Sequence, residues 1–480
     1  MVLSLSAQVR RIPGALLGAL LLAALCGPLA MSARPTYDMD LSIDWETGTY
    51  VGEARVTTEN STDQTLDRLV FRLFPNDRHI YTGASLEVVD ATQSGTPLGF
   101  EIGEDPTILT VPLLEPLQPE QTVSLTLRFE GTAGPSPEDT HFRYSGFGLL
   151  TKNSSSLVLT AFYPLLAPFG EEGVVVHPLC ENGDSLWSDS ADYTVRVIAP
   201  AGLDPASSGR LVSSSTLGDI ALHAFEVDMA RDFALVLTFG MEQMELASSG
   251  RAFRTWFDEA QSEAAAKALA VASDSADLFT ELLGPLPFHE VDLVEVPLSR
   301  AAGVEYTGLI LLSSNYAAMS EDDIYTTLVA HEVAHQWFYA AVGNDPDYEC
   351  WLDEGPAIFL ANVFLDHVGL ARDASGERSL WKINYEAGQA TDPGATIATP
   401  NCDFGSSSSY ALHILSGGPH FLQALRTEMG DEAFFHGLRS YVQSHIGRIG
   451  TTDALLDAFT DACECDLSKI YQSFGFDHSG

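Results

Sequence analysis

Residues 331–335 read HEVAH, and residues 351–355 read WLDEG, which brings in Glu354. On a helix, side chains four positions apart project from one face, so His331 and His335 can turn both imidazoles toward one ion. Two imidazoles and the carboxylate of Glu354 suit Zn²⁺ and leave its fourth coordination position open for water. Glu332 lies beside His331, where its carboxylate can reach that water as a general base. The pattern predicts one zinc ion and hydrolysis by activated water.

The flanking residues indicate helices. Ser320 followed by the acidic residues 321–323 resembles an N-cap and first turn, and residues 324–342 contain few helix breakers before Gly343. We therefore expect the motif in the middle of a helix over 324–342. A second helix is predicted from 353 to 368, antiparallel to the first, with Glu354 in its first turn. The alternative is a buried helix with two satisfied histidines, which would make Glu354 a coincidence.

The eighteen residues between His335 and Glu354, with the Trp-Leu-x-Glu-Gly pattern, resemble the gluzincin aminopeptidases typified by aminopeptidase N. Residues 302–306, AGVEY, are similar to that family's Gly-x-Met-Glu-Asn motif. The resemblance implies that Glu305, in the same motif as Gly303, binds the free α-amino group of a substrate. Val and Tyr replace the usual Met and Asn, so this match is weaker than the zinc motif. The alternative for Glu305 is a solvated carboxylate at a strand end.

One position departs from the family pattern. The resemblance places a Tyr, whose hydroxyl steadies the oxyanion, at the position occupied here by Leu415. Tyr410 lies five residues earlier, which is more than one α-helical turn. Either another group such as Tyr410 serves, the local alignment is shifted, or activity is low.

The rest of the chain follows two patterns. From about Tyr37 to Gly240, short runs alternate apolar and polar residues between turn signals, which predicts an antiparallel β-sandwich over 36–243. From about residue 250 to 480, helical and strand patterns mix, and the resemblance implies a thermolysin-like α+β catalytic domain with a helical C-terminal part. The irregular stretch 391–409 is expected to wall the substrate cleft.

The composition excludes some classes of function. The chain of 480 residues carries 24 basic and 66 acidic residues, a formal charge of −42. Such a balance argues against binding nucleic acid or anionic membranes by charge. Apolar residues make up 45% of the chain, which indicates a globular protein.

The N-terminus predicts a targeting segment. Residues 1–33 combine Arg10 and Arg11 with an apolar stretch and small residues near position 32, as in a signal peptide, or alternatively an uncleaved membrane anchor. The catalytic part is therefore expected outside the cytoplasm, secreted or anchored. An oxidising compartment permits disulfides, and a bridge from Cys350 to Cys402 would brace the site.

These observations favour a secreted zinc metallopeptidase, an aminopeptidase acting on peptides with a free N-terminus. A zinc-binding pseudo-peptidase or accessory binding protein with little catalysis is the alternative, because Leu415 lacks a hydroxyl. A hydrolase of another bond that uses the same zinc site is a third hypothesis.

Overall fold

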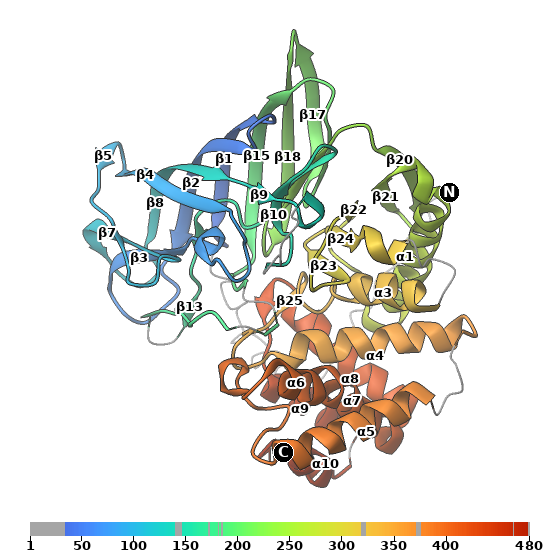
Figure 1. Ribbon diagram of the computed structural model, residues 1–480. Helices are drawn as coiled ribbons and strands as arrows, with labels where there is room; N and C mark the ends of the chain where they lie inside the picture. Colours follow the sequence, from blue (N-terminus) through green and yellow to red (C-terminus); the bar gives the residue numbers. More distant parts are fainter. Residues whose placement is uncertain are drawn as a thin grey trace, which may run out of the picture. The chain divides into compact units, whose positions relative to one another are not determined.

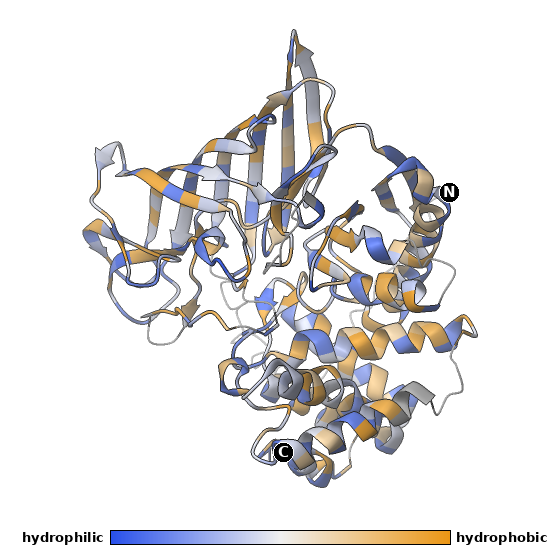
Figure 2. Ribbon diagram, viewed as in Figure 1, coloured by the Kyte–Doolittle hydropathy of each residue, from blue (hydrophilic) through white to orange (hydrophobic). Residues whose placement is uncertain are grey.

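Alternating side chains along β1 (Thr36–Asp44) explain why the first part of the chain forms sheets. Tyr37, Met39, Leu41 and Ile43 are buried, and the residues between them are exposed. This period of two places one face of the strand on a core and the other in solvent. Figure 2 shows the same alternation as hydrophobic and hydrophilic bands along the strands of the large sheet.

The largest sheet has eight strands in the order β17-β18-β15-β1-β2-β8-β4-β5, several of which run side by side in Figure 1. Its further strands are β2 (Thr49–Glu59), β4 (Ser85–Gln93), β5 (Thr96–Pro97), β8 (Thr122–Thr132), β15 (Ala191–Pro200), β17 (Arg210–Leu217) and β18 (Ile220–Ala230). Most neighbours are antiparallel, but β1 and β15 are parallel, a pairing that the strand pattern alone did not indicate.

Two smaller sheets share the apolar core of this large sheet. One contains β9 (Gly134–Pro135), β10 (Leu150–Lys152), β11 (Ser156–Leu159), β16 (Asp204–Ser207) and β19 (Leu235–Thr238). The other contains β3 (Leu66–Arg72), β6 (Glu101–Ile102), β7 (Ile108–Leu117) and β12 (Leu165–Leu166). A hairpin joins β13 (Phe169–Gly170) to β14 (Gly173–Val174). Sheets packed on a shared core confirm the predicted β-rich first part.

The computed structural model describes residues 34–139, 146–170, 173–180, 182–183, 186–317, 323–370, 376–463 and 465–478, with backbone alone at 139 and 376–379. The segment 1–33, predicted to be a signal peptide or anchor, lies outside these residues. Residues from Arg34 onward form one compact unit, so the predicted domain bounds 36–243 and 250–480 stay predictions. Within the described part of the chain, no helix combines the length and apolar character needed to cross a bilayer.

A mixed five-stranded sheet, β20-β21-β22-β24-β23, begins the second part. Its strands are β20 (Glu242–Ser248), β21 (Arg251–Phe257), β22 (Glu290–Val296), β23 (Gly303–Tyr306) and β24 (Leu309–Ser313). Helix α1 (Ser262–Leu283) packs against it, and the short helix α2 (Ser314–Ala317) follows β24. This mixture of strands and helices confirms the predicted α+β class.

Helices make up most of the remainder and share a second apolar core with α1. They are α3 (Asp323–Ala334), α4 (Trp351–His367), α5 (Gly376–Thr391), α6 (Ser407–Tyr410), α7 (Gly417–Met429), α8 (Asp431–His445), α9 (Thr452–Cys463) and α10 (Ser468–Ser473). A short parallel pairing joins β25 (Val342–Gly343) to β26 (Arg448–Ile449). α3 packs directly on α4, which brings the two predicted ligand helices together.

The predicted extent of the first ligand helix was wrong at its C-terminal end. α3 stops at Ala334, so the motif lies at the end of the helix and not in its middle, while the proposed cap at Ser320 lies outside the described residues. Tyr339 has a φ of 122°, which no helix can continue through. Buried Arg231 donates from Nε to the carbonyl of Tyr339 at 2.9 Å, and Asp232 accepts from the Tyr339 hydroxyl at 2.6 Å. A contact from a distant segment therefore ends the helix.

Gly343 also has a different role from the predicted helix cap. A Cβ atom at this position would lie 2.3 Å from the guanidinium carbon of Arg231. The glycine thus makes room for the buried arginine that holds the turn after α3.

Candidate metal centre and active site

The ends of two packed helices bring the three predicted ligands together. His331 lies in the last turn of α3, His335 follows that helix directly, and Glu354 lies in the first turn of α4. The amide of His335 still donates to the carbonyl of His331 at 3.3 Å, so the two imidazoles keep the spacing of a helical turn. One atom from each of the three side chains lies within 4.8 Å of the others. The convergence predicted from the sequence is therefore present.

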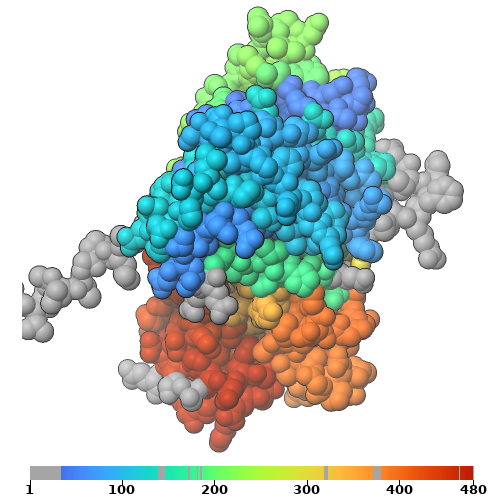
Figure 3. Space-filling model, turned by 90° about the vertical axis from the view of Figure 1, so that its left-hand side faces the viewer, coloured from blue at the N-terminus to red at the C-terminus, as the bar shows by residue number. Residues whose placement is uncertain are grey.

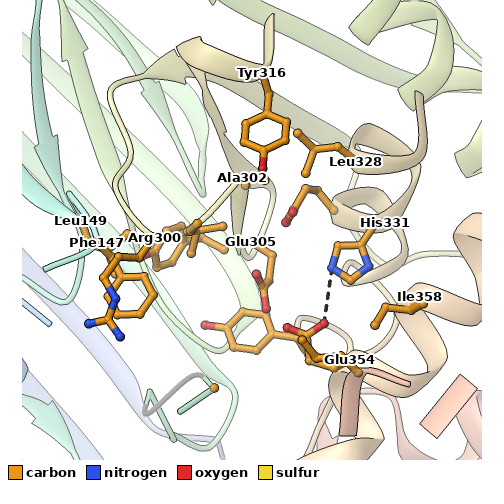
Figure 4. A pocket seen from close by; sticks show the side chains of 18 of the residues that line it. Phe147, Leu149, Arg300, Ala302, Glu305, Tyr316, Leu328, His331, Glu354 and Ile358 are labelled. Atoms are coloured by element: carbon orange, nitrogen blue, oxygen red, sulfur yellow. Dashed lines mark ion pairs between the residues drawn. The ribbon is translucent and has the colours of Figure 1, made fainter. Parts of the chain in front are cut away.

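The distances within this cluster fit a small tetrahedral cation. Nε2 of His331 lies 3.2 Å from Nε2 of His335 and 3.4 Å from Oε2 of Glu354. Bonds of about 2.0–2.1 Å at tetrahedral angles place ligand atoms about 3.3–3.4 Å apart. The ion pair between His331 and Glu354 is drawn as a dashed line in Figure 4. Two imidazoles and one carboxylate at these separations are a suitable set of ligands for zinc.

Asp353 orients one of the imidazoles. Its Oδ1 lies 2.6 Å from Nδ1 of His335, and the carbonyl of Phe338 lies 3.1 Å from the same nitrogen. A hydrogen on Nδ1 directed at these acceptors leaves the lone pair of Nε2 facing His331 and Glu354. Carboxylates that hold a ligating histidine in this way fix its tautomer and make it a stronger ligand. From the sequence, Asp353 is predicted only as part of a helix start, although its place next to Glu354 could have suggested this role.

The electrostatic surroundings of the two histidines differ. Burial lowers the pKa of His331, and the neighbouring His335 lowers it further, so that its imidazole is neutral. Burial also disfavours charge on His335, but the carboxylates of Glu305 and Asp353 outweigh it and raise the pKa of that imidazole. The site therefore holds an excess of negative charge that favours a bound cation.

Glu332 lies against the backbone of β23. Its side chain is 2% exposed, and a Cβ atom on Gly303 would lie 2.3 Å from its Oε1. A glycine at 303 is therefore required if the carboxylate is to occupy this position. Glu332 also contributes to a group with Glu305 and His335 whose candidate ligand atoms lie within 4.8 Å of one another. The predicted base is thus adjacent to the predicted ligands.

Glu305 projects from β23 toward the same cluster. Its Oε1 lies 3.6 Å from Nδ1 of His335, and the residue is 7% exposed. This burial contradicts the alternative of a solvated carboxylate at a strand end. A buried carboxylate beside these candidate zinc ligands is suited to receive a cationic amine.

Four of these side chains line one cavity of about 620 Å³: those of Glu305, His331, Glu332 and Glu354. Figure 4 shows His331, Glu354 and Ile358 on one side, Tyr316 and Leu328 at another, and Phe147, Leu149 and Arg300 beyond Glu305. The lining residues are Ile80, Tyr81, Phe147, Leu149, Gly183, Leu186, Arg300, Ala301, Ala302, Gly303, Val304, Glu305, Tyr306, Tyr316, Ile324, Thr327, Leu328, His331, Glu332, Tyr339, Glu354, Ile358, Ala361, Tyr410 and Leu415. Both parts of the chain contribute, so the cavity is built from β strands and helices together.

The segment carrying Tyr410 and Leu415 is not α-helical throughout. Residues Ala411–Leu415 form a π-helical turn, and the amide of Ser416 donates to the carbonyl of Ala411, five residues back, at 3.2 Å. A turn of this width brings residues five apart near one another along one face. Tyr410 and Leu415 accordingly line the same cavity. The expectation that five residues exceed one turn holds for an α-helix but not for this segment.

Tyr410 packs against a segment from the first part of the chain and against a nearby phenylalanine. The segment at Gly183 lies against its hydroxyl, since a Cβ atom there would be 2.6 Å from that oxygen. Nδ2 of Asn401 donates to the carbonyl of Asn182 at 2.7 Å, and the ring of Phe404 packs edge-on against Tyr410. In Figure 3, green atoms of the first part lie between the blue strands and the orange-to-red helices.

A disulfide reinforces this contact, although not the one that was expected. Cys180 pairs with Cys402, and Cys463 with Cys465, while Cys350 is a buried free thiol. The predicted bridge from Cys350 to Cys402 was therefore wrong, because Cys402 faces the segment at Cys180 from the β-rich part. The stretch 391–409, which was expected to wall the substrate cleft, contributes no residue to the cavity lining, whereas Tyr410 and Leu415, just beyond it, do line the cavity.

Comparison with known proteins agrees with the fold and the cluster. Residues 268–474 match the Peptidase family M1 domain. An M1 zinc metallopeptidase from Deinococcus radiodurans shares the fold, with a TM-score of 0.63 and 21% identity over 93% of this chain and 95% of that one. A two-domain M1 zinc metallopeptidase mutant bound to L-arginine also shares the fold, with a TM-score of 0.65 and 19% identity. The match covers 93% of this chain and 94% of that one.

The chain is also similar in sequence to known aminopeptidases. Aminopeptidase M1 of Arabidopsis thaliana is 21% identical over 309 residues, 59% of this chain and 34% of that protein. Aminopeptidase N of Lactobacillus helveticus is 26% identical over 192 residues, 37% of this chain and 22% of that protein. The chain thus matches about a third or less of the length of these relatives.

The fold is shared with solved M1 zinc metallopeptidases, and the three convergent side chains are a suitable set of ligands for zinc. The chain carries a Peptidase family M1 domain at residues 268–474, and the resemblance to the aminopeptidase N family is confirmed.

Proposed function

We propose that this protein is a zinc-dependent aminopeptidase that removes N-terminal residues from peptides. The observation that carries the proposal is the convergence of His331, His335 and Glu354, with Glu305 and Glu332 in the same cavity. The three ligands supply a metal site, and the two further carboxylates supply a base and a receptor for an amine. All of the curated relatives described above are aminopeptidases, which supports this choice over a hydrolase of another bond.

The zinc ion, when held by these three side chains, supplies a Lewis acid that polarises the scissile carbonyl and makes water more acidic. Glu332 accepts the proton of the attacking water and passes it to the nitrogen of the leaving amine. Its burial against Gly303 keeps the carboxylate directed at the cluster and shields it from bulk solvent. General acid–base catalysis of this kind typically contributes about 10²–10⁴ in rate.

Glu305 makes the reaction an exopeptidase reaction. Its buried carboxylate, 3.6 Å from the ring of His335, pairs with the protonated α-amino group of a substrate. Fixing that amine next to the ligands places the first peptide bond, and no later bond, beside Glu332. A peptide bound to a related protein supports a peptide substrate, since a mutant of the Deinococcus radiodurans enzyme is described in complex with Tyr-Ser-Ala.

Tyr410 supplies the hydroxyl that Leu415 lacks. The π-helical turn at 411–415 brings the tyrosine onto the cavity beside that leucine. The residue is 6% exposed, packs against Phe404 and lines the same cavity as His331 and Glu354, which supports Tyr410 as the donor to a developing oxyanion. The absence of a hydroxyl at 415 was the reason to consider a zinc-binding protein with little catalysis, and a hydroxyl from Tyr410 in the same cavity supports the catalytic hypothesis instead.

A comparison of substrates tests the proposal. The protein, loaded with zinc, is expected to hydrolyse leucine amide at least about a hundredfold faster than N-acetyl-leucine amide, because only the first can pair with Glu305. Glu305→Gln should raise KM for the free-amino substrate and reduce this discrimination. Equal turnover of both substrates would favour an endopeptidase, and no turnover of either would favour the binding protein.

We also infer that the protein acts outside the cytoplasm. The disulfides Cys180–Cys402 and Cys463–Cys465 support an oxidising compartment. Residues 1–33 would direct the chain there, either as a cleaved signal peptide or as a membrane anchor. N-terminal sequencing of the exported protein decides between the two.

A further inference from the structure

The cavity contains a cationic side chain that neither the metal cluster nor the proposed catalytic steps use. Among its lining residues, all of which are described, Arg300 is the one lysine or arginine. The whole chain carries 24 lysines and arginines against 66 acidic residues, so a basic side chain is an uncommon kind of residue to find in the lining of a cavity of this protein. Apart from tyrosines, the other ionisable side chains of the lining are one histidine and three glutamates.

The backbone holds Arg300 in a constrained position. Its φ of 70° lies in the left-handed region, which residues with a side chain seldom adopt. The preceding residue is fixed, because the amide of Ser299 donates to the carbonyl of Phe147 at 2.9 Å. The guanidinium carbon lies 5.0 Å from the centre of the Phe147 ring, as expected for a cation–π contact. The guanidinium is therefore held against the Phe147 ring, although the residue itself is exposed.

The position of Arg300 relative to Glu305 determines which part of a substrate it can contact. Figure 4 shows Glu305 between the ligand His331 on one side and Arg300, Phe147 and Leu149 on the other. If the α-amino group of a substrate binds Glu305, the peptide chain continues past the metal ligands and away from Arg300. Only the side chain of the first residue can then extend into the part of the cavity at Arg300.

The walls of that part favour a side chain with an apolar stem. Ile80, Tyr81 and Leu149 line it from the first part of the chain, and Ala301 and Ala302 continue the wall beside Arg300. Methylene groups can cover these surfaces, and a terminal carboxylate can accept hydrogen bonds from the guanidinium, whose fork matches it.

We infer that Arg300 makes the enzyme select peptides whose first residue has an acidic side chain, with glutamate the best fit. The inference rests on the proposed aminopeptidase activity and names its substrate class. The net charge of −42 opposes an acidic substrate at long range. At physiological salt, charges more than about 8 Å away are largely screened, so the adjacent guanidinium outweighs them.

Three substrates of equal backbone test the inference: the p-nitroanilides of glutamate, glutamine and leucine. Glutamine is nearly the same shape as glutamate but carries no charge, so the ratio of their kcat/KM values isolates the charge. The wild-type protein should prefer glutamate over glutamine by at least about tenfold. Arg300→Gln should reduce this ratio to near one, and Arg300→Lys should retain part of the preference.

The matched control is Arg210→Gln, which removes an exposed arginine of β17 whose nearest acidic partner, Glu226, lies 3.8 Å away. This variant should keep the wild-type ratio. A wild-type ratio near one, or a ratio unchanged by Arg300→Gln, would overturn the inference while turnover of the leucine substrate upholds the proposed function. Failure to hydrolyse any of the three would overturn the proposed function, and the inference with it.

Discussion

Nδ1 of His335 lies 2.6 Å from Oδ1 of Asp353, and this contact joins the end of one ligand helix to the start of the other. The residue next to Asp353 is itself a predicted ligand, so a single short segment of α4 both orients an imidazole and contributes Glu354. The contact fixes the geometry of the cluster through the protein, independently of a metal ion. It therefore bears directly on how tightly zinc would be held.

Removing this carboxylate should weaken metal binding. Asp353→Asn is expected to lower zinc affinity by about 10–100-fold, because the imidazole of His335 loses its negatively charged partner. Competition with a chelator measures the affinity. Asp366→Asn, an exposed position of the same helix, is the control and should bind zinc as the parent does. Equal affinities of all three proteins would contradict the role given to Asp353.

A methyl group at position 303 should disable the base. In Gly303→Ala the new Cβ would meet Oε1 of Glu332 at 2.3 Å, so the carboxylate must move. Misplacing a catalytic group by about 1 Å can reduce the rate about a hundredfold, and kcat for an aminoacyl amide is the measurement. Gly405→Ala serves as control, because its added Cβ has no heavy atom within 4 Å. Unchanged kcat in Gly303→Ala would show that Glu332 does not act from its observed position.

Loss of the Tyr410 hydroxyl should reduce kcat with little effect on KM. An oxyanion donor acts only in the transition state, and its removal typically reduces kcat by about 10²–10³. Tyr410→Phe keeps the ring against Phe404, so the comparison isolates the hydroxyl. Tyr348→Phe, at an exposed position outside the cavity lining, is the control.

A rescue experiment strengthens that test. Leu415→Tyr in the Tyr410→Phe background restores a hydroxyl on the same wall of the cavity and should recover part of the lost rate. A Tyr410→Phe variant with kcat within about threefold of the parent would rule out the assignment.

The metal ligands were predictable from the sequence because they are local. The spacing of His331 and His335 fixes one helical face, and the residues around Glu354 indicate a second helix. The alternation along β1 likewise predicts a strand with one buried face. In each case the residues that form the pattern lie close together in the sequence, within one or two helical turns or within a single strand.

The features that the sequence did not predict depend on contacts between distant segments. Arg231 and Asp232 end α3 by holding Tyr339, more than a hundred residues away, and nothing near Ala334 indicates this. Cys402 pairs with Cys180 across 222 residues, which no count of cysteines could reveal. The π-helical turn before Ser416 has no marked breaker at its start. Tertiary packing decided all three.

The pH dependence of stability should reflect Glu295 on β22. Its carboxylate is 5% exposed, and neither oxygen has a hydrogen-bond partner among the described residues. Burial, assisted by the charge of Asp258, raises its pKa from 4.5 to about 8. Between these values the unfolded chain releases the proton and the folded protein retains it, so the free energy of unfolding falls as pH rises.

Glu295→Gln should remove this dependence. A pKa shift of this size corresponds to a loss on the order of 4 kcal/mol between about pH 4.5 and pH 8. Denaturant titrations at pH 4.5, 6 and 8 should show the wild type losing stability relative to the variant as pH increases. Parallel curves for the two proteins would indicate that Glu295 ionises normally in the folded state.

The most direct test of the account measures zinc and turnover on the same samples. Elemental analysis should find one zinc ion per chain in the wild type and in Glu332→Gln, and much less in a variant lacking both His331 and Glu354. The wild type should hydrolyse leucine amide, Glu332→Gln should do so about 10²–10⁴ times more slowly, and the variant lacking both ligands should show no turnover. Full turnover by metal-free protein, or undiminished turnover by Glu332→Gln, would contradict the assignment of this cluster as a zinc peptidase site.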